Sequence, residues 1–578
     1  MMASRSTIQF IWGPVRALLR KLPERETLLL LSVVTGVLCG GAAVLLKWSI
    51  HSIQTGLGSL FPDRRWPYLV FPGVGMLLSL LIVRYLVKDN IGHGVTKVLQ
   101  AVSKNESKIK KHNLWSSMLT SALTIGFGGS VGAEAPIVYT GAAIGSNLAR
   151  YCGLSYRGMT LLLGCGAAGA VAGIFNAPLA GVLFTLEVLL FNISMTSILP
   201  LLLSSLSATL VSYAFFGRGA QFEASLVEFS MRNIPWYVLL GVFSGFVSLY
   251  FLRTTLWMED MVSRLRSPWI RWALSAVGLG LLIYFLPPLY GEGYDSLRPM
   301  LSGSAGSGAL WLFVLVLVFK VFSMSLTNAG GGVGGTFGPT LFVGAVAGFV
   351  MATAVNSFLP YQIPVSNFVL VGMAGTMAGV MQAPLTAIFL IAEISGGYIL
   401  LVPLILTAAV SYGVTRIFEK YSIYTKRIAA SGELLTHDSD QAVLTLLKTD
   451  ALLETDFTPV RIDDSLGQLV EAVAVSQRNI FPVVDAHGRF QGYVQLADIR
   501  RDMFRTDLYD TAYVYNYMHS APEYIYRDEP MESVMRKFEK TGAWNLPVVT
   551  SDRTYLGFLS KSKIFNAYRQ SLRDFSQD

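Results

Sequence analysis

The sequence predicts an α-helical membrane protein that crosses the bilayer several times and ends in a small α/β tail. Hydrophobic residues make up 52% of the 578 residues and charged residues only 14%, with a mean hydropathy of +0.50. A soluble protein of this length is far less apolar. From Ala309 to Thr415 only Lys320 and Glu393 carry formal charges, so this stretch holds several spans of about 20 residues. After about Arg427 the apolar runs shorten and charge becomes frequent, which indicates a water-soluble domain.

The N-terminal segment indicates which side of the membrane the chain starts on. It has neither the short apolar core nor the small-residue cleavage site of a signal peptide. Ahead of the apolar run at 27–46 it carries Arg5, Arg16, Arg20, Lys21 and Arg25. Basic flanks favour the cytoplasmic side. The net charge of +8 then reflects topology, and no nucleic-acid partner is expected.

Two pairs of segments indicate that the membrane part is internally duplicated. The stretch AGIFNAPLAGVLFTLE at 172–187 matches AGVMQAPLTAIFLIAE at 378–393, at an offset of 206. Upstream, GGSVGAEAP at 128–136 corresponds to GGVGGTFGP at 331–339, with the prolines offset by 203. Internal duplication is typical of transporter folds, whose binding sites lie at the repeat interface near the bilayer midplane. The residues alone leave open whether the repeats are parallel or inverted.

The Gly-rich segments before Pro136 and Pro339 indicate broken helices, because helix interiors disfavour Gly and Pro. Irregular backbone at membrane depth must be buried in protein or line a watery cavity. A helix that restarts there presents unpaired N–H groups and a positive dipole end, which together attract an anion. The alternative is that the glycines serve only close helix packing.

Glu134 is the residue that gives this pattern a function. A carboxylate inside a bilayer is costly and is seldom there without a task. As an anion at the start of a helix, it is suited to the site that a permeant anion would use. Protonation would then release it. A helix-capping role near the membrane interface is the alternative.

The tail is duplicated at an offset of 65. IFPVVDAHGRFQGYVQLADI at 480–499 parallels NLPVVTSDRTYLGFLSKSKI at 545–564. Each copy has the pattern of a strand, a polar turn, a second strand and a helix start. The predicted domains are an N-terminal segment at 1–25, a transmembrane domain at 26–427 with repeats at about 26–220 and 230–427, a linker at 428–450, and modules at 451–508 and 509–578.

Taken in order, these motifs resemble the CLC family of chloride channels and proton/chloride exchangers. The GAEAP segment at 132–136 resembles the family's Gly-(Arg/Lys)-Glu-Gly-Pro loop, and GTFGP at 335–339 resembles its Gly-x-Phe-x-Pro loop. FNAPLAGVLFTLE is similar to the helix that follows the first loop, and SIYTKRI puts Tyr424 where the family has its pore tyrosine. The tail resembles the paired CBS domains of many members.

The resemblance implies a fold and a site. Glu134 would be the external gate, and the Tyr424 hydroxyl with the amides of Thr336 and Phe337 would bind the central chloride. The repeats would be inverted, with broken helices meeting at a central anion site. The protein would be a homodimer with one pore per subunit in a lipid bilayer, in a bacterial inner or plasma membrane. Its termini and CBS domains would be cytoplasmic.

Two loops depart from the family pattern. Ala133 replaces the Arg or Lys of the glutamate loop, so a cation beside the gate is lost. The family's Gly-Ser-Gly-Ile-Pro loop corresponds to GHGVT at 92–96, so His93 replaces the anion-binding serine. Imidazole can also donate an N–H to an anion, and we predict that His93 and Gly94 contact it. A capping or packing role for His93 is the alternative.

A third departure bears on proton coupling. Family exchangers carry a second glutamate immediately after the position of Glu187, where this chain has Val188. Valine cannot relay a proton, so we predict passive or weakly coupled, channel-like chloride conduction. A proton-coupled chloride antiporter is the alternative, because some family members without that glutamate stay coupled. A fluoride- or nitrate-selective member is less favoured.

Glu187 and Glu393 end helices that would lie near the dimer interface, and a structural role is expected for both.

The ribose-binding pattern of CBS domains, Thr/Ser-x-x-Asp, is half intact in each module. The first module has Gln495 with Asp498, and the second has Ser560 with Lys563. We therefore predict a structural tail that supports the dimer and needs no cofactor. Adenine-nucleotide binding through Asp498 is the alternative.

Other classes of function fit the sequence poorly. No HExxH, GxSxG or P-loop motif is present, and the six histidines are scattered. The three cysteines, Cys39, Cys152 and Cys165, have no metal-binding spacing. We therefore expect no enzyme and no metal site. A cation or metal transporter would require several acidic residues within the membrane, whereas anion-attracting helix starts dominate this chain.

Overall fold

The chain forms two units, Met1–Leu434 and Leu435–Asp578, described separately below. The computed structural model describes residues 23–61, 65–104, 107–189, 195–217, 222, 225–302, 310–429 and 449–576. The predicted N-terminal segment at 1–25 and linker at 428–450 lie almost wholly outside these residues.

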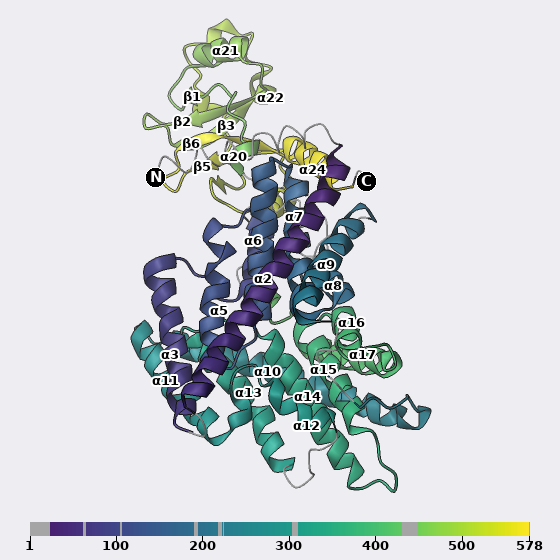
Figure 1. The fold of residues 1–578 in the computed structure, drawn as a ribbon. Helices are drawn as coiled ribbons and strands as arrows, with labels where there is room; N and C mark the ends of the chain where they lie inside the picture. Colours follow the sequence, from purple (N-terminus) through teal and green to yellow (C-terminus); the bar gives the residue numbers. More distant parts are fainter. Residues whose placement is uncertain are drawn as a thin grey trace. The chain divides into compact units, whose positions relative to one another are not determined.

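The first unit is helical throughout its described residues (Figure 1). Its first half contains α2 (Glu24–Leu60), α3 (Pro67–Leu81), the π-helical turn η1 (Ile82–Val87), α4 (Gly94–Lys104), η2 (Lys111–Leu114), α5 (Ser116–Gly126), α6 (Glu134–Cys152), α7 (Tyr156–Phe175), α8 (Pro178–Val188) and α9 (Met195–Phe216). Its second half contains η3 (Met231–Asn233), α10 (Ile234–Ser263), α11 (Pro268–Phe285), η4 (Pro287–Leu289), η5 (Tyr294–Leu297), α12 (Arg298–Leu301), α13 (Leu310–Ala329), α14 (Phe337–Asn356), α15 (Val365–Met381), α16 (Pro384–Ile394), α17 (Leu401–Phe418) and α18 (Thr425–Ala429).

Nine helices in the described residues are long and apolar enough to cross a membrane, as expected of a multi-pass membrane protein. Among them α7 and α14 are almost wholly buried within the protein, whereas only 28% and 22% of the residues in the apolar windows that contain α3 and α11 are buried. A helix that is apolar on all sides and buried belongs to the centre of a membrane domain. The exposed apolar helices are the ones suited to face lipid.

The predicted duplication is visible in the backbone. α7 ends at Asn176 with φ 59°, and α15 ends at Gln382 with φ 53°. Left-handed backbone is uncommon for residues other than Gly, yet it recurs at an offset of 206. In both repeats an Ala-Pro step then starts the next short helix, α8 or α16. The two repeats therefore share their helix breaks as well as their sequence motifs.

The two Gly-rich loops join the repeats at the centre of the first unit. The Gly132 N–H donates to the Gly335 carbonyl at 3.0 Å, and the Gly335 N–H donates to the Gly132 carbonyl at 2.7 Å. This antiparallel bridge brings the starts of α6 and α14 to one point. Pro136 and Pro339 are each the third residue of their helix, within the first turn, where Pro is tolerated.

The second unit consists of two α/β modules with the same topology. In each three-stranded sheet the first strand pairs parallel to the second, and the second pairs antiparallel to the third. A register shift at Val483/Val484 recurs at Val548/Val549, 65 residues later. The elements are α20 (Thr449–Leu452), β1 (Val460–Arg461), α21 (Leu466–Val475), β2 (Ile480–Val484), β3 (Phe490–Gln495), α22 (Leu496–Ile499), η7 (Thr506–Leu508), η8 (Val514–Asn516), β4 (Ile525–Tyr526), α23 (Met531–Thr541), β5 (Asn545–Val549), β6 (Tyr555–Ser560) and α24 (Lys561–Ser576).

Each module of the tail packs against the segment that precedes the other. Glu454, ahead of strand β1 of the first module, forms two backbone hydrogen bonds of 2.9 Å with Phe558 of the second. The Leu466 N–H of the first module donates to the Ala512 carbonyl at 2.8 Å, although 512 lies beyond the boundary predicted at 508. Phe490 packs edge-on against Phe558, with ring centroids 6.2 Å apart. The modules thus form one unit, and the boundary at 508 stays a prediction.

Candidate functional site

Glu134 is the first residue of α6, and its side chain is buried, with 2% of the residue exposed. Its Oε2 accepts a hydrogen bond from the Gly338 N–H at 3.2 Å, and its Oε1 accepts one from the Tyr294 hydroxyl at 3.2 Å. Gly338 lies in the first turn of α14. The carboxylate from one repeat therefore occupies the helix N-terminus of the other, where unpaired N–H groups and the helix dipole favour negative charge.

Gly132 makes room for this carboxylate. A Cβ at position 132 would lie 2.0 Å from Oε2 of Glu134, closer than any non-bonded contact allows. Any larger residue there would have to move the Glu134 side chain. Gly132, a residue of the inter-repeat bridge, is thus part of the site.

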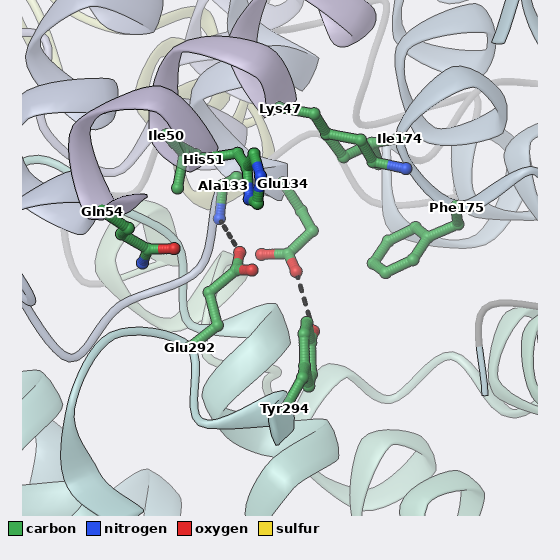
Figure 2. A pocket seen from close by; sticks show the side chains of 10 residues that line it. All are labelled: Lys47, Ile50, His51, Gln54, Ala133, Glu134, Ile174, Phe175, Glu292 and Tyr294. Carbon is green, nitrogen blue, oxygen red and sulfur yellow. Dashed lines mark hydrogen bonds between the residues drawn. The ribbon is translucent and has the colours of Figure 1, made fainter. Parts of the chain in front are cut away.

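A cavity of about 110 Å³ opens beside Glu134 (Figure 2). Residues of α2, α6, α7 and the loop around 292 line it: Lys47, Ile50, His51, Gln54, Ala133, Glu134, Ile174, Phe175, Glu292 and Tyr294. Figure 2 shows the carboxylates of Glu134 and Glu292 pointing toward one another, each with a dashed hydrogen bond to a separate donor. The cavity therefore holds two acidic groups, together with a lysine.

Sequence reasoning did not find Glu292, Tyr294 or Lys47. Glu292 stands in the segment GEGY at 291–294, between glycines, much as Glu134 stands among small residues. The rule applied to Glu134, that an acidic residue between apolar spans needs an explanation, also covers Glu292 and could have found it. Tyr294 and Lys47 offered no comparable signal.

The structure brings three of the predicted anion-binding residues together. Thr336 precedes α14 and Phe337 is its first residue. The Tyr424 hydroxyl lies 3.5 Å from the Oγ1 of Thr336, and Tyr424 is 4% exposed. The Phe337 ring packs on Phe175, with ring centroids 5.0 Å apart. The hydroxyls of Thr336 and Tyr424 thus lie together at the buried start of α14. The anion contacts predicted for these residues stay a prediction.

Tyr424 is held by contacts on both sides of it. The Ile423 N–H donates to the Val380 carbonyl at 3.3 Å. Before it, Glu419 forms ion pairs with Lys426 at 2.6 Å and Arg253 at 3.0 Å. Burial alone would raise the pKa of Glu419, but the hydrogen bonds from Lys426 and Arg253 outweigh it and hold that pKa below its usual value. Glu419 therefore stays ionised at neutral pH, and its ion pairs fix the segment that carries the tyrosine.

His93 and Gly94 occupy different surroundings. His93 precedes α4 with φ 56°, and its Nε2 lies 3.9 Å from a carboxylate oxygen of Glu259. Gly94 starts α4 against the Glu134 segment, since a Cβ there would lie 2.4 Å from the Ala135 carbonyl oxygen. Gly94 is thus near the Glu134 segment, whereas the His93 imidazole has an acidic neighbour. The predicted anion contacts of both residues stay predictions.

Glu187 caps the start of α16 in the second repeat, and Glu393 caps the start of α8 in the first. Glu187, near the end of α8, accepts from the Leu385 N–H at 3.0 Å and from the Thr386 N–H and hydroxyl at 2.7 Å each. Glu393, near the end of α16, accepts from the Leu179 N–H at 3.0 Å and the Ala180 N–H at 2.9 Å. Each carboxylate thus satisfies the first amides of the equivalent helix, in agreement with the structural role expected for both.

Val188 is the last residue of α8 and is 4% exposed. Its side chain is apolar, so this buried position has no group that can carry a proton.

Asp498 in the tail is already engaged. Its Oδ2 accepts from the Gln495 N–H at 2.8 Å, and its Oδ1 lies 3.2 Å from Nε2 of His519. A cavity of about 480 Å³ adjoins the same segment, with Gln495, Arg500 and Trp544 in its lining. In the second module the Ser560 hydroxyl donates to Glu454. The retained half of each ribose-binding pattern therefore makes contacts within the tail.

Metal ligation receives no support from the described residues, in which no three His, Cys, Asp or Glu side chains are grouped to hold an ion. Cys39 and Cys165 are buried.

Comparison with known proteins connects this geometry to a family. The model of the voltage gated chloride channel family matches residues 74–416, and the CBS domain model matches residues 514–570. A ClcB-like chloride channel protein of Ralstonia nicotianae is 30% identical over 393 residues, which cover 66% of this chain and 91% of that protein.

Solved structures support the fold. A slow cyanobacterial Cl⁻/H⁺ antiporter is similar with a TM-score of 0.64 and 22% identity, over 71% of this chain and 98% of that one. A eukaryotic CLC transporter is similar with a TM-score of 0.62 and 18% identity, over 93% of this chain and 97% of that one. The predicted fold class is thereby confirmed: a polytopic helical membrane domain of two inverted repeats, followed by a small α/β tail.

Proposed function

The chain belongs to the voltage gated chloride channel (CLC) family, and on that premise we propose that it conducts chloride through a pathway gated by Glu134. One observation carries the proposal: the buried Glu134 carboxylate sits at the N-terminus of α14, hydrogen-bonded to the Gly338 amide and the Tyr294 hydroxyl. A place that binds a tethered anion through neutral donors is equally suited to a free one.

The gate would open when the carboxylate leaves this place. An ionised carboxylate competes with chloride for the same N–H and O–H donors. Once protonated, it loses the negative charge that the helix end favours, and a chloride ion can take its place. Chloride flux should therefore rise as the pH falls.

A second anion position is proposed below the gate. It would use the Tyr424 hydroxyl and the amides of Thr336 and Phe337 at the start of α14. The 3.5 Å approach of the two hydroxyls of Tyr424 and Thr336 supports it, as does the burial of all three residues. His93 and Gly94, at the start of α4, complete the proposed set.

We favour passive or weakly coupled conduction over proton exchange. The support is Val188, which is apolar and 4% exposed, because a proton cannot cross apolar packing without a titratable group or water. A proton-coupled chloride antiporter is the second candidate, favoured by the carboxylate of Glu292 beside Glu134. A fluoride- or nitrate-selective member has no specific observation behind it.

Reconstituted protein can test the function directly. Liposomes loaded with chloride are diluted into low-chloride buffer, and chloride efflux is recorded together with external pH and with sodium or magnesium efflux. Potassium with the ionophore valinomycin supplies the counter-ion, and the proposal then predicts chloride efflux well above that of protein-free liposomes, retained sodium and magnesium, and little uphill proton movement. Cation efflux without chloride would refute it. Strong proton pumping by the wild-type protein, driven by the chloride gradient, would decide for the antiporter. If the wild type conducts like a channel, Val188→Glu should increase the coupling of chloride to proton movement.

The assembly and location are proposed with the same function. The starts of α8 and α16 expose leucines at equivalent positions, Leu179 at 38% and Leu385 at 48%, and such paired apolar surface suits the interface of a homodimer with one pore per subunit. We place the protein in a bacterial inner or plasma membrane, with its termini and CBS domains in the cytoplasm. The tail would support the dimer without a cofactor, since both Asp498 oxygens already have partners.

A further inference from the structure

The second acidic group in the cavity is bound to a helix-start amide of its own. Oε1 of Glu292 accepts a hydrogen bond from the Ala133 N–H at 3.1 Å, directly before the first residue of α6. Glu134 meanwhile accepts from Gly338 at the start of α14. Each of the two facing helix starts therefore gives an N–H group to a carboxylate, and both carboxylates border the cavity of about 110 Å³ (Figure 2).

The backbone holds Glu292 in this position. The flanking residues Gly291 and Gly293 have φ 58° and 89°, a conformation that Gly adopts at little cost. The Gly291 N–H donates to the Gly128 carbonyl at 3.1 Å. The loop is thus tied to the Gly-rich segment of the first repeat, which aims the side chain at the start of α6.

A buried lysine anchors the same loop from the other side. Lys320 of α13 is fully buried, and its Nζ donates to the Gly291 carbonyl at 2.9 Å. The ammonium also lies 4.8 Å from the centre of the Phe342 ring. An ammonium taken out of water is costly unless it has partners, so its place beside the Glu292 loop is consistent with charge balance in this part of the protein.

The charged and titratable groups around Glu292 come from four elements: Lys47 and His51 of α2, Glu134 of α6, Lys320 of α13, and Tyr294 and Asp295 after Glu292 itself. Of these, Glu134 is the acidic group that shares the cavity, whereas the Asp295 side chain is 98% exposed. Two carboxylates that border one small, partly buried cavity repel one another and any entering anion more than they would in water.

We propose that the Glu292 carboxylate is a second tethered anion of the gate. It binds the Ala133 N–H at the start of α6 while Glu134 binds the Gly338 N–H at the start of α14. This inference rests on the proposed chloride pathway and deepens it. Chloride entering the cavity must compete with two carboxylates, so Glu292 lowers the affinity for anions at the outer end of the pathway. It also makes opening depend on two protonation events in place of one.

The test compares Glu292→Gln and Glu292→Ala with Asp295→Asn in the full-length protein. Gln keeps an acceptor for the Ala133 amide and removes the charge, whereas Ala removes both. Asp295→Asn removes an exposed carboxylate from the same loop and serves as the matched control. Chloride affinity is measured by calorimetry in detergent, and the pH dependence of chloride efflux is measured in proteoliposomes.

Both Glu292 variants should bind chloride at least about fivefold more tightly, because a like charge near the site is gone. Their efflux should also rise less steeply as the pH falls, while Asp295→Asn behaves as wild type. A purely structural role would lower thermal stability without increasing affinity. Wild-type affinity and steepness in a folded Glu292→Gln protein would overturn the inference while leaving the Glu134 gate intact. Failure of the wild-type protein to bind or move chloride would instead overturn the proposed function.

Discussion

Removing the Tyr294 hydroxyl is a sharp test of the gate. Tyr294→Phe deletes the group that donates to Oε1 of Glu134 at 3.2 Å and keeps the ring that packs edge-on against Phe222, with centroids 5.4 Å apart. A hydrogen bond to a charged acceptor contributes about 1.5–3 kcal/mol. At 1.36 kcal/mol per pH unit, that range corresponds to about one to two units.

The direction of the shift follows from which state the hydroxyl stabilises. It donates to the ionised, seated carboxylate, so its loss makes protonation and departure easier. The pH at half-maximal chloride flux should therefore rise by about one unit, the lower end of the range, because a 3.2 Å bond is long and the Gly338 amide remains.

Chloride efflux from proteoliposomes at a series of pH values measures this midpoint. Tyr250→Phe is a suitable control, because it removes a hydroxyl that donates at 2.8 Å to the Val318 carbonyl, outside the cavity lining. The control should keep the wild-type midpoint. If Tyr294→Phe folds normally and its midpoint stays in place or moves to lower pH, the hydroxyl does not hold the gate and the reasoning fails.

Three further predictions concern the proposed anion position at Tyr424, the helix cap formed by Glu187, and the tail. Tyr424→Phe should weaken chloride binding by about tenfold, because one donor to the anion is lost; unchanged affinity by calorimetry would place the binding site elsewhere. Glu187→Ala leaves the first amides of α16 uncapped and should lower the free energy of unfolding by about 1–3 kcal/mol, with an unchanged flux midpoint. Loss of flux with unaltered thermal stability would contradict a structural role. Deleting 444–578 should leave a conducting membrane domain, and ATP or AMP should not shift the melting temperature of the full-length protein; a clear shift would revive nucleotide binding at Asp498.

The duplicated parts of the fold could be predicted because both copies are present in one chain. The offset of 65 in the tail places β5 at 545, where strand β2 at 480 predicts it. The offset of 203 pairs Gly132 with Gly335, and these two residues meet through backbone hydrogen bonds. In each case two segments with the same sequence pattern face the same physical requirement, so one copy supports the interpretation of the other.

The rest of the proposed gate depends on contacts that the local sequence does not encode. Tyr294 and Glu292 reach Glu134 and Ala133 from about 160 residues away, so the sequence could single out Glu292 but not its partner. His93 also has a neighbour that the local sequence does not encode, because its imidazole lies 3.9 Å from Glu259, on a helix far along the chain. The anion contact predicted for His93 stays a prediction.

Chloride efflux from proteoliposomes containing Glu134→Gln, measured beside wild type from acid to neutral pH with simultaneous proton recording, tests the central claim most directly. Gln resembles the protonated side chain and cannot ionise. The account predicts that wild-type efflux rises steeply as the pH falls, whereas Glu134→Gln already conducts chloride at neutral pH, keeps only the shallower pH dependence that Glu292 contributes, and moves no protons uphill. A wild-type pH profile in Glu134→Gln would contradict the account, because Glu134 could then not be the group whose ionisation closes the pathway.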